Sequence, residues 1–229
     1  MKSIETKTLP ILPLLLLLLG VVAGAVLGGC SFLRPHDDPT RFYVLTGPPA
    51  LTARLPDGEF KQLRMGLKPV EVAAYLRTKS IVVRTGTNEI QLAEFDRWAE
   101  PLSQGIGRVI MEDLRSARNV ASVTLNSHGG NALDYEVALQ ILACEGVRGE
   151  HGTSSIRFAA TWEVRAVGTN ALAPKLGGFT AGAVPWGGKD YGQLAERLSD
   201  AITAASIALA ADLPREATLP PQATPPARP

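Results

Sequence analysis

Three carboxylates lie close together in the sequence, around two aromatic side chains. Glu94, Asp96 and Glu100 alternate with Phe95 and Trp98. Paired carboxylates can cleave a glycan, one as general acid and the other as base or nucleophile, so the stretch is a candidate glycosidase site. In the alternative interpretation, Asp96 and Glu100 cap and order the start of a helix while Phe95 and Trp98 pack beneath it. We favour the structural interpretation.

Other groups that perform catalysis or bind metal do not form a recognisable set. The sequence contains no Gly-x-Ser-x-Gly, His-Glu-x-x-His or Cys-x-x-Cys motif and no phosphate loop ending in Gly-Lys-Ser/Thr. His36, His128 and His151 fall in predicted loops and lack the spacing of metal ligands. Glu112 and Asp113 are adjacent, so they point to different faces of a helix and cannot act as a pair. We therefore expect no enzymatic activity, no catalytic residue, no metal and no cofactor.

A cysteine that could be modified by lipid follows an apolar segment near the N-terminus. The first 29 residues carry Lys2 and Lys7 and an apolar stretch from Leu9 to Leu27, which is typical of a cleaved secretory signal. The stretch ends in Leu27-Gly28-Gly29-Cys30, which resembles the lipobox of bacterial lipoproteins. The alternative is an uncleaved membrane anchor, but prolines and glycines interrupt the apolar stretch. We expect cleavage after Gly29 and lipidation of Cys30.

A lipid on Cys30 would hold the mature chain at a membrane. Such a cysteine carries more than one acyl chain, and each buried CH₂ contributes about 0.8 kcal/mol, so anchoring would be stable. Ser31 follows the cysteine, where an Asp in enteric bacteria favours the inner membrane. We therefore expect a lipid-anchored protein of the cell envelope, on the periplasmic face of the outer membrane. The remaining thiol, Cys144, lies in an apolar run and is expected to be buried as a small hydrophobic side chain.

The charge of the mature chain excludes one class of partner. Removal of the signal removes two lysines and one glutamate, which leaves equal numbers of acidic and basic residues. Proteins that bind nucleic acid through phosphate neutralisation carry basic stripes, and this sequence has none. We expect no nucleic-acid binding.

The elements that must position these residues can be read from hydrophobic periodicity. Strict alternation over Arg157 to Val167 predicts a strand with one apolar face, paired with Tyr135 to Cys144 around a hairpin tip from Glu145 to Ser155. A second hairpin is predicted around Gly86-Thr87-Asn88, between Ile81–Thr85 and Glu89–Leu92. The remaining candidates are strands over Arg41–Thr46 and Leu67–Val72 and a helical turn over Ala73–Arg77.

Two helices are predicted by apolar residues at intervals of three and four. The first follows Pro101 and buries a stripe from Leu102 to Leu114, with Gly105 and Gly107 permitting close packing. The second begins after Asp190, whose side chain is expected to cap it, and extends to Leu209. We predict an α+β fold, a single domain with a largely antiparallel sheet and two long helices packed on one face, against Phe158, Trp162 and Val164. The predicted boundaries are a signal (1–29), a tether (30–40), the domain (41–211) and a disordered Pro-rich tail (212–229).

Three segments also carry a family resemblance. Pro69–Leu76, Ile81–Ile90 and Ala93–Leu102 resemble the PqiC-like (YmbA-like) ABC-type transport auxiliary lipoproteins, and Phe-Asp-Arg-Trp-Ala-Glu-Pro-Leu at residues 95–102 is the most specific part. The likeness spans most of residues 27–210 and includes Phe42-Tyr43-Val44-Leu45. The chain departs from the family pattern at Ala74, where the family usually has Pro, and at Lys79-Ser80, where it commonly has Pro-Gln.

The resemblance implies a non-enzymatic component of an envelope lipid-transport system. Its partners would be a periplasmic MCE-domain (mammalian cell entry) channel protein and ABC or other inner-membrane components, and the lipoprotein would dock the channel at the outer membrane. A ring-like homo-oligomer would suit such a partner. The alternatives are a periplasmic hydrolase and a passive envelope-structural lipoprotein. The resemblance assigns a structural or partner-binding role to the motif residues Phe95, Asp96, Arg97, Trp98, Glu100, Pro101 and Leu102.

Overall fold

The computed structural model describes residues 37–47, 62–117, 119–125, 133–149, 152–168 and 173–214. The predicted signal with Leu27, Gly28, Gly29 and Cys30, the three histidines, and the tail beyond Pro214 lie outside these residues. The chain divides into two compact units, Met1–Pro39 and Thr40–Pro229, and the fold described here is that of the second.

A long antiparallel hairpin forms the centre of the sheet. It consists of β7 (Tyr135–Arg148) and β8 (Ser154–Ala166), in register so that Leu139 lies opposite Trp162. Alternate residues of β8 are buried, as the period of two predicts. The strands are longer than expected, because residues assigned to the hairpin tip, including Glu145 and Arg148, continue the ladder.

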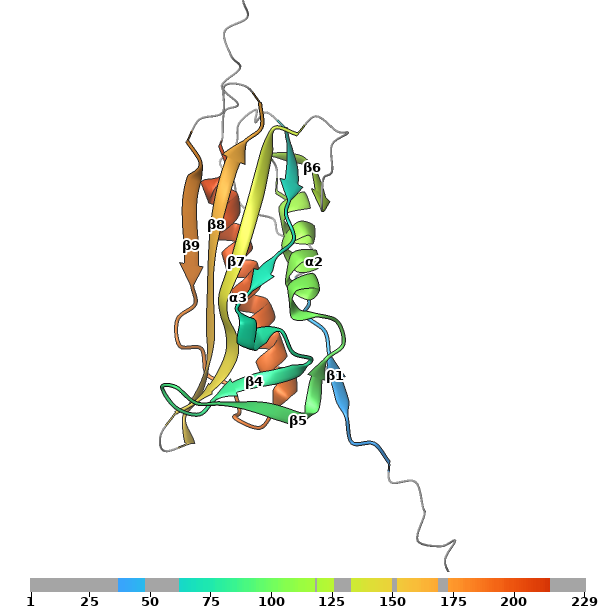
Figure 1. Ribbon diagram of the computed structural model, residues 1–229, viewed down its shortest axis with the longest axis vertical. Coiled ribbons are helices and arrows are strands. Elements are labelled where there is room, and N and C mark those ends of the chain that lie inside the picture. The colour runs from blue at the N-terminus through green and yellow to red at the C-terminus, as the bar shows by residue number, and fades with distance from the viewer. Residues whose placement is uncertain are drawn as a thin grey trace, which may run out of the picture. The chain divides into compact units, whose positions relative to one another are not determined.

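Within the described residues, seven shorter strands complete a mixed sheet (Figure 1). They are β1 (Arg41–Tyr43), β2 (Leu63–Leu67), β3 (Glu71–Val72), β4 (Ser80–Arg84), β5 (Ile90–Trp98), β6 (Val120–Leu125) and β9 (Lys175–Thr180). The main path runs β1-β5-β4-β7-β2-β6, while β3 pairs with β7 and β9 with β8. The ladders β7–β8, β8–β9 and β4–β5 are antiparallel and the others are parallel, so the sheet is mixed and its longest ladder, β7–β8, is antiparallel as expected.

Local pairing explains where the strands differ from expectation. The predicted hairpin of β4 and β5 is confirmed. The strand expected over Leu67–Val72 is instead the end of β2 and all of β3, because the interruption contains Pro69, which has no N–H for a ladder. The first strand ends at Tyr43, since only Arg41–Tyr43 pair with β5. Neither β6 nor β9 was expected, because buried and exposed residues do not alternate strictly in β6 and β9 contains two glycines.

Two helices cover one face of the sheet, which confirms the α+β class. They are α2 (Leu102–Arg115) and α3 (Tyr191–Asp212), and a 3₁₀ turn, η2 (Ala74–Leu76), follows β3. The backbone N–H of Gln193 donates to the Asp190 carboxylate at 3.0 Å, which confirms the predicted cap of α3. In Figure 1, α3 lies behind β7 and β8, and α2 packs beside it against β6.

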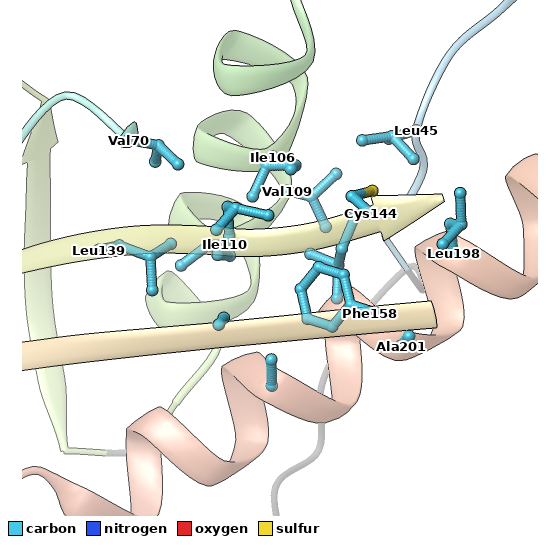
Figure 2. Packing of buried hydrophobic residues seen from close by; sticks show 14 of the residues in the cluster. Leu45, Val70, Ile106, Val109, Ile110, Leu139, Cys144, Phe158, Leu198 and Ala201 are labelled. Carbon is cyan, nitrogen blue, oxygen red and sulfur yellow. The ribbon is translucent and has the colours of Figure 1, made fainter. Parts of the chain in front are cut away.

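The core lies between these helices and the sheet. Phe158 is fully buried there, among side chains from α2, α3 and β7 (Figure 2). Cys144 lies in the same cluster as a free thiol, as predicted. Burial raises the pKa of this thiol to about 12, and the neighbouring Glu145 adds to the shift. The thiol is therefore protonated and inert at neutral pH.

Candidate functional site

The motif at residues 95–102 crosses from the end of β5 to the start of α2. β5 continues through Trp98, and α2 begins at Leu102 with Pro101 at the N-cap and no side-chain cap. The interpretation that Asp96 and Glu100 cap this helix is therefore wrong, as is the packing of Phe95, which is exposed. The physical reason is that residues 96–98 pair with β1, a partner more than 50 residues away in sequence.

Asp96 ties β5 to β1. Its carboxylate accepts a hydrogen bond from the Tyr43 hydroxyl at 2.8 Å and pairs with Arg41 at 3.1 Å. The Asp96 side chain is largely buried, whereas that of Arg41 is exposed, so the tyrosine bond is the stronger tie. Burial, and then the bond to Asp96, raise the pKa of Tyr43 to about 12.

Glu100 makes the second tie through Arg108 of α2. The Arg108 guanidinium donates both to the Glu100 carboxylate at 2.7 Å and to the backbone carbonyl of Leu45 at 2.8 Å. A Cβ on Gly105 would lie 3.1 Å from Glu100 Oε1, so the glycine leaves room for this carboxylate. Thr46 continues the attachment, since its backbone N–H donates to Ser199 Oγ of α3 at 3.1 Å.

The apolar residues of the motif attach β1 and the residues that follow it to the core. Trp98 and Leu102 are buried, and Leu45 beside them is buried as well. The backbone N–H of Ala99 donates to the Tyr43 carbonyl at 2.8 Å. We call this arrangement the N-terminal clamp, formed by Tyr43, Leu45, Asp96, Trp98, Glu100 and Arg108. It fastens the segment that leads back to Cys30.

An open groove lies on the opposite face of the sheet from the helices. It has a volume of about 590 Å³ and is lined by residues including Glu71, Gln140, Thr161 and Leu176. In the ladder register Gln140 lies opposite both Glu71 and Thr161, and Leu176 lies opposite Glu163. Leu176 is 74 % exposed and lies next to the polar side chains of the groove. The groove is therefore a candidate contact surface.

The geometry favours support over catalysis in the carboxylate cluster. Asp96 bonds Tyr43 and Arg41, and Glu100 bonds Arg108, so both carboxylates join elements of the fold. In the part of the chain that the structure describes, no group of three or more His, Cys, Asp or Glu side chains is placed to hold a metal ion.

Comparison with known proteins assigns the family. A family model described as "ABC-type transport auxiliary lipoprotein component" matches residues 43–210. The chain belongs to this family. The match contains the whole clamp, both helices as far as Ala210, and every strand after β1.

Solved structures share the fold of this auxiliary lipoprotein. A crystal structure of a Xanthomonas campestris protein, described under the family model DUF330, is 16% identical, with a TM-score of 0.61 over 75% of this chain and 93% of that chain. A crystal structure of an uncharacterized protein is 14% identical, with a TM-score of 0.55 over 76% and 97%. No curated protein matches the sequence. In the described part of the auxiliary lipoprotein, no helix has the length and hydropathy needed to cross a bilayer.

Sequence reasoning identified half of the clamp. It singled out Asp96, Trp98 and Glu100 but not their partners Tyr43 and Arg108. The family resemblance did contain Tyr43, in Phe42-Tyr43-Val44-Leu45. No local pattern connects that string with Asp96, because the two are 53 residues apart.

Tyr43→Phe tests the clamp of the auxiliary lipoprotein. Loss of the hydroxyl bond to Asp96 is expected to lower the free energy of unfolding by about 1 kcal/mol, measured by urea denaturation. The pKa is about 10 in the unfolded chain and about 12 in the fold, so the Tyr43 contribution is complete below pH 10 and is lost between pH 10 and 12. Between pH 10 and 12, the free energy of unfolding of the Tyr43→Phe variant should therefore fall less than that of the wild type.

Tyr135→Phe is the matched control. No hydrogen bond of the Tyr135 hydroxyl is found among the described residues, so its removal should change stability by less than about 0.5 kcal/mol. Equal losses from the two tyrosines would contradict the clamp.

Proposed function

We propose that this protein is a non-enzymatic, membrane-anchored component of an ABC/MCE-type envelope lipid transport system. It docks the periplasmic MCE channel protein at the outer membrane. The observation that carries the proposal is the family match over residues 43–210, which covers nearly all of the described domain. The lipobox-like Leu27-Gly28-Gly29-Cys30 supports attachment to lipid, and Ser31 supports the outer membrane.

The clamp gives the family motif at residues 95–102 a structural role that requires no catalytic residue. In the proposal the domain is attached to the membrane through its N-terminal segment, so that segment must stay joined to the folded body. In the proposal, Asp96, Trp98, Glu100 and Leu102 hold the first strand against the sheet and α2. Pro101 starts α2, which carries Arg108 to the strand.

The groove supplies the surface for the channel protein in this proposal. It combines an exposed leucine with polar side chains, and it lies beside β9, which in the described sheet pairs with β8 alone. An edge strand next to an open sheet face can accept an extended segment of a partner. The helices on the opposite face already cover the core, so they do not compete for this surface.

Leu176→Arg is the variant that tests partner docking. The residue is 74 % exposed, so the substitution should leave the fold intact. Recovery of the MCE protein in a pull-down from solubilised membranes is expected to fall about tenfold, which corresponds to a modest interface hot spot. Ile207→Arg on α3 is the control, because Ile207 is also an exposed aliphatic residue but lies in the helix layer.

The same pull-down separates the competing functions. Recovery of peptidoglycan in place of an MCE protein by the wild-type chain would favour the envelope-structural alternative. A hydrolase would lose activity in the folded variants Asp96→Asn and Glu100→Gln, whereas a docking protein that keeps its fold should retain partner binding. Sizing of the purified complex tests the ring-like homo-oligomer that a ring-shaped channel would suit.

A further inference from the structure

Two aromatic side chains are exposed on the outer side of the clamp. Phe42 of β1 is 63 % exposed and Phe95 of β5 is 42 % exposed. Phe42 lies opposite Arg97 in the parallel ladder, and residues paired in this way project from the same face of a sheet. Because Asp96 and Trp98 point inward, Phe95 and Arg97 on either side of Asp96 point outward.

Arg97 is the exposed cation that accompanies these rings, because it lies opposite Phe42 and two residues from Phe95. Arg41 instead lies opposite Asp96 and pairs with it, so it projects from the other face of the strands. The exposed carboxylate of β5 is Glu94. Asp96 contributes little negative charge to the surface, because it is buried against Tyr43 and Arg41. The outward face therefore combines two apolar rings with the Arg97 cation.

The covalent chain keeps this surface close to the proposed anchor. Ten residues separate Cys30 from Arg41, which is the first residue of β1. Fully extended, such a tether reaches at most about 40 Å, and a flexible chain of this length spans less on average. The surface that carries Phe42 is thus the described part of the domain nearest in sequence to the lipid.

We propose that Phe42, Phe95 and Arg97 form a membrane-facing patch that lies on a phospholipid surface. The rings enter the headgroup region, where aromatic side chains are favoured, and the Arg97 guanidinium binds a lipid phosphate. The inference rests on the proposed lipidation of Cys30 and adds a second contact to it.

The test uses the full lipidated protein in vesicles of phosphatidylcholine and phosphatidylglycerol. Val44→Cys places a thiol on the exposed side of the same segment, and an environment-sensitive fluorophore is attached there. Cys144 stays unlabelled because it is buried and its pKa is raised, and an acylated Cys30 has no free thiol. Leu176→Cys places the matched label in the groove, away from the proposed patch in sequence.

The expected result is strong quenching at position 44 by spin-labelled lipid, at least about twofold more than at position 176. Adding Phe42→Ser and Phe95→Ser should reduce the quenching at 44 to the level at 176, while the protein still floats with the vesicles. Flotation of the wild-type protein without quenching at 44 would overturn the patch and leave the anchor intact. Failure to float would overturn the lipidation and the patch together. Cross-linking of position 44 to a second copy, without lipid quenching, would overturn the patch in favour of a homo-oligomer contact.

Discussion

Glu145→Ala is expected to lower the free energy of unfolding by about 3 to 5 kcal/mol, as measured by urea denaturation. The Glu145 side chain is fully buried, and it accepts from Arg84 Nε at 2.7 Å and from Arg157 at 3.3 Å. Arg84 is itself only 18 % exposed, and its guanidinium lies over the ring of Tyr75. Removal of the carboxylate leaves a buried cation without its counter-charge, and β4, β7 and β8 lose their shared tie.

Two further variants test whether the loss of stability depends on the burial of the ion pair. Glu163→Ala breaks the pair with Arg165, in which both side chains are more exposed, and should cost less than about 1 kcal/mol. The double variant Arg84→Met with Glu145→Leu replaces the buried ions by apolar groups and should be more stable than Glu145→Ala. Equal costs for Glu145→Ala and Glu163→Ala would show that the buried pair contributes no more than a surface pair.

Cys30→Ala is expected to abolish membrane attachment without unfolding the domain. The acyl chains contribute about 0.8 kcal/mol for each buried CH₂, so losing them should shift the protein from the membrane to the soluble fraction or leave it as unprocessed precursor. Every residue of the core cluster lies at or beyond Leu45, so circular dichroism and the urea midpoint should be unchanged for processed protein. Membrane fractionation and the mass of the mature chain measure the outcome.

The other cysteine provides the control for anchoring. Cys144→Ala removes a buried thiol and should cost about 1 kcal/mol of stability, while membrane attachment stays as in the wild type. Full envelope function in the Cys30→Ala variant would refute the argument that the protein acts by being held at a membrane.

Features governed by neighbouring residues could be predicted from the sequence. The alternation in β8, the turn at Gly86-Thr87-Asn88 and the cap at Asp190 each depend on a few consecutive residues, and the structure confirms them. Burial of Cys144 followed from its apolar surroundings. The α+β class followed from these elements, because two amphipathic helices and a strand with one apolar face must bury their apolar faces against each other.

Features that depend on distant partners could not be predicted in this way. Glu145 was assigned to a hairpin tip because charge and glycine are typical of turns, and only the convergence of Arg84 and Arg157 makes its burial possible. β6 and β9 have weak patterns of their own and exist because β2 and β8 offer free edges.

The carboxylates around Trp98 show most clearly the difference between what the sequence determines and what the tertiary structure determines. Their types and spacing permitted a glycosidase site or a helix cap, and the sequence determined only that polar groups alternate there with aromatic ones. The tertiary structure decided that Asp96 bonds Tyr43 and that Glu100 bonds Arg108. A side chain takes its role from the groups that reach it, and chain folding brings those groups from segments whose separation in sequence carries no periodic signal.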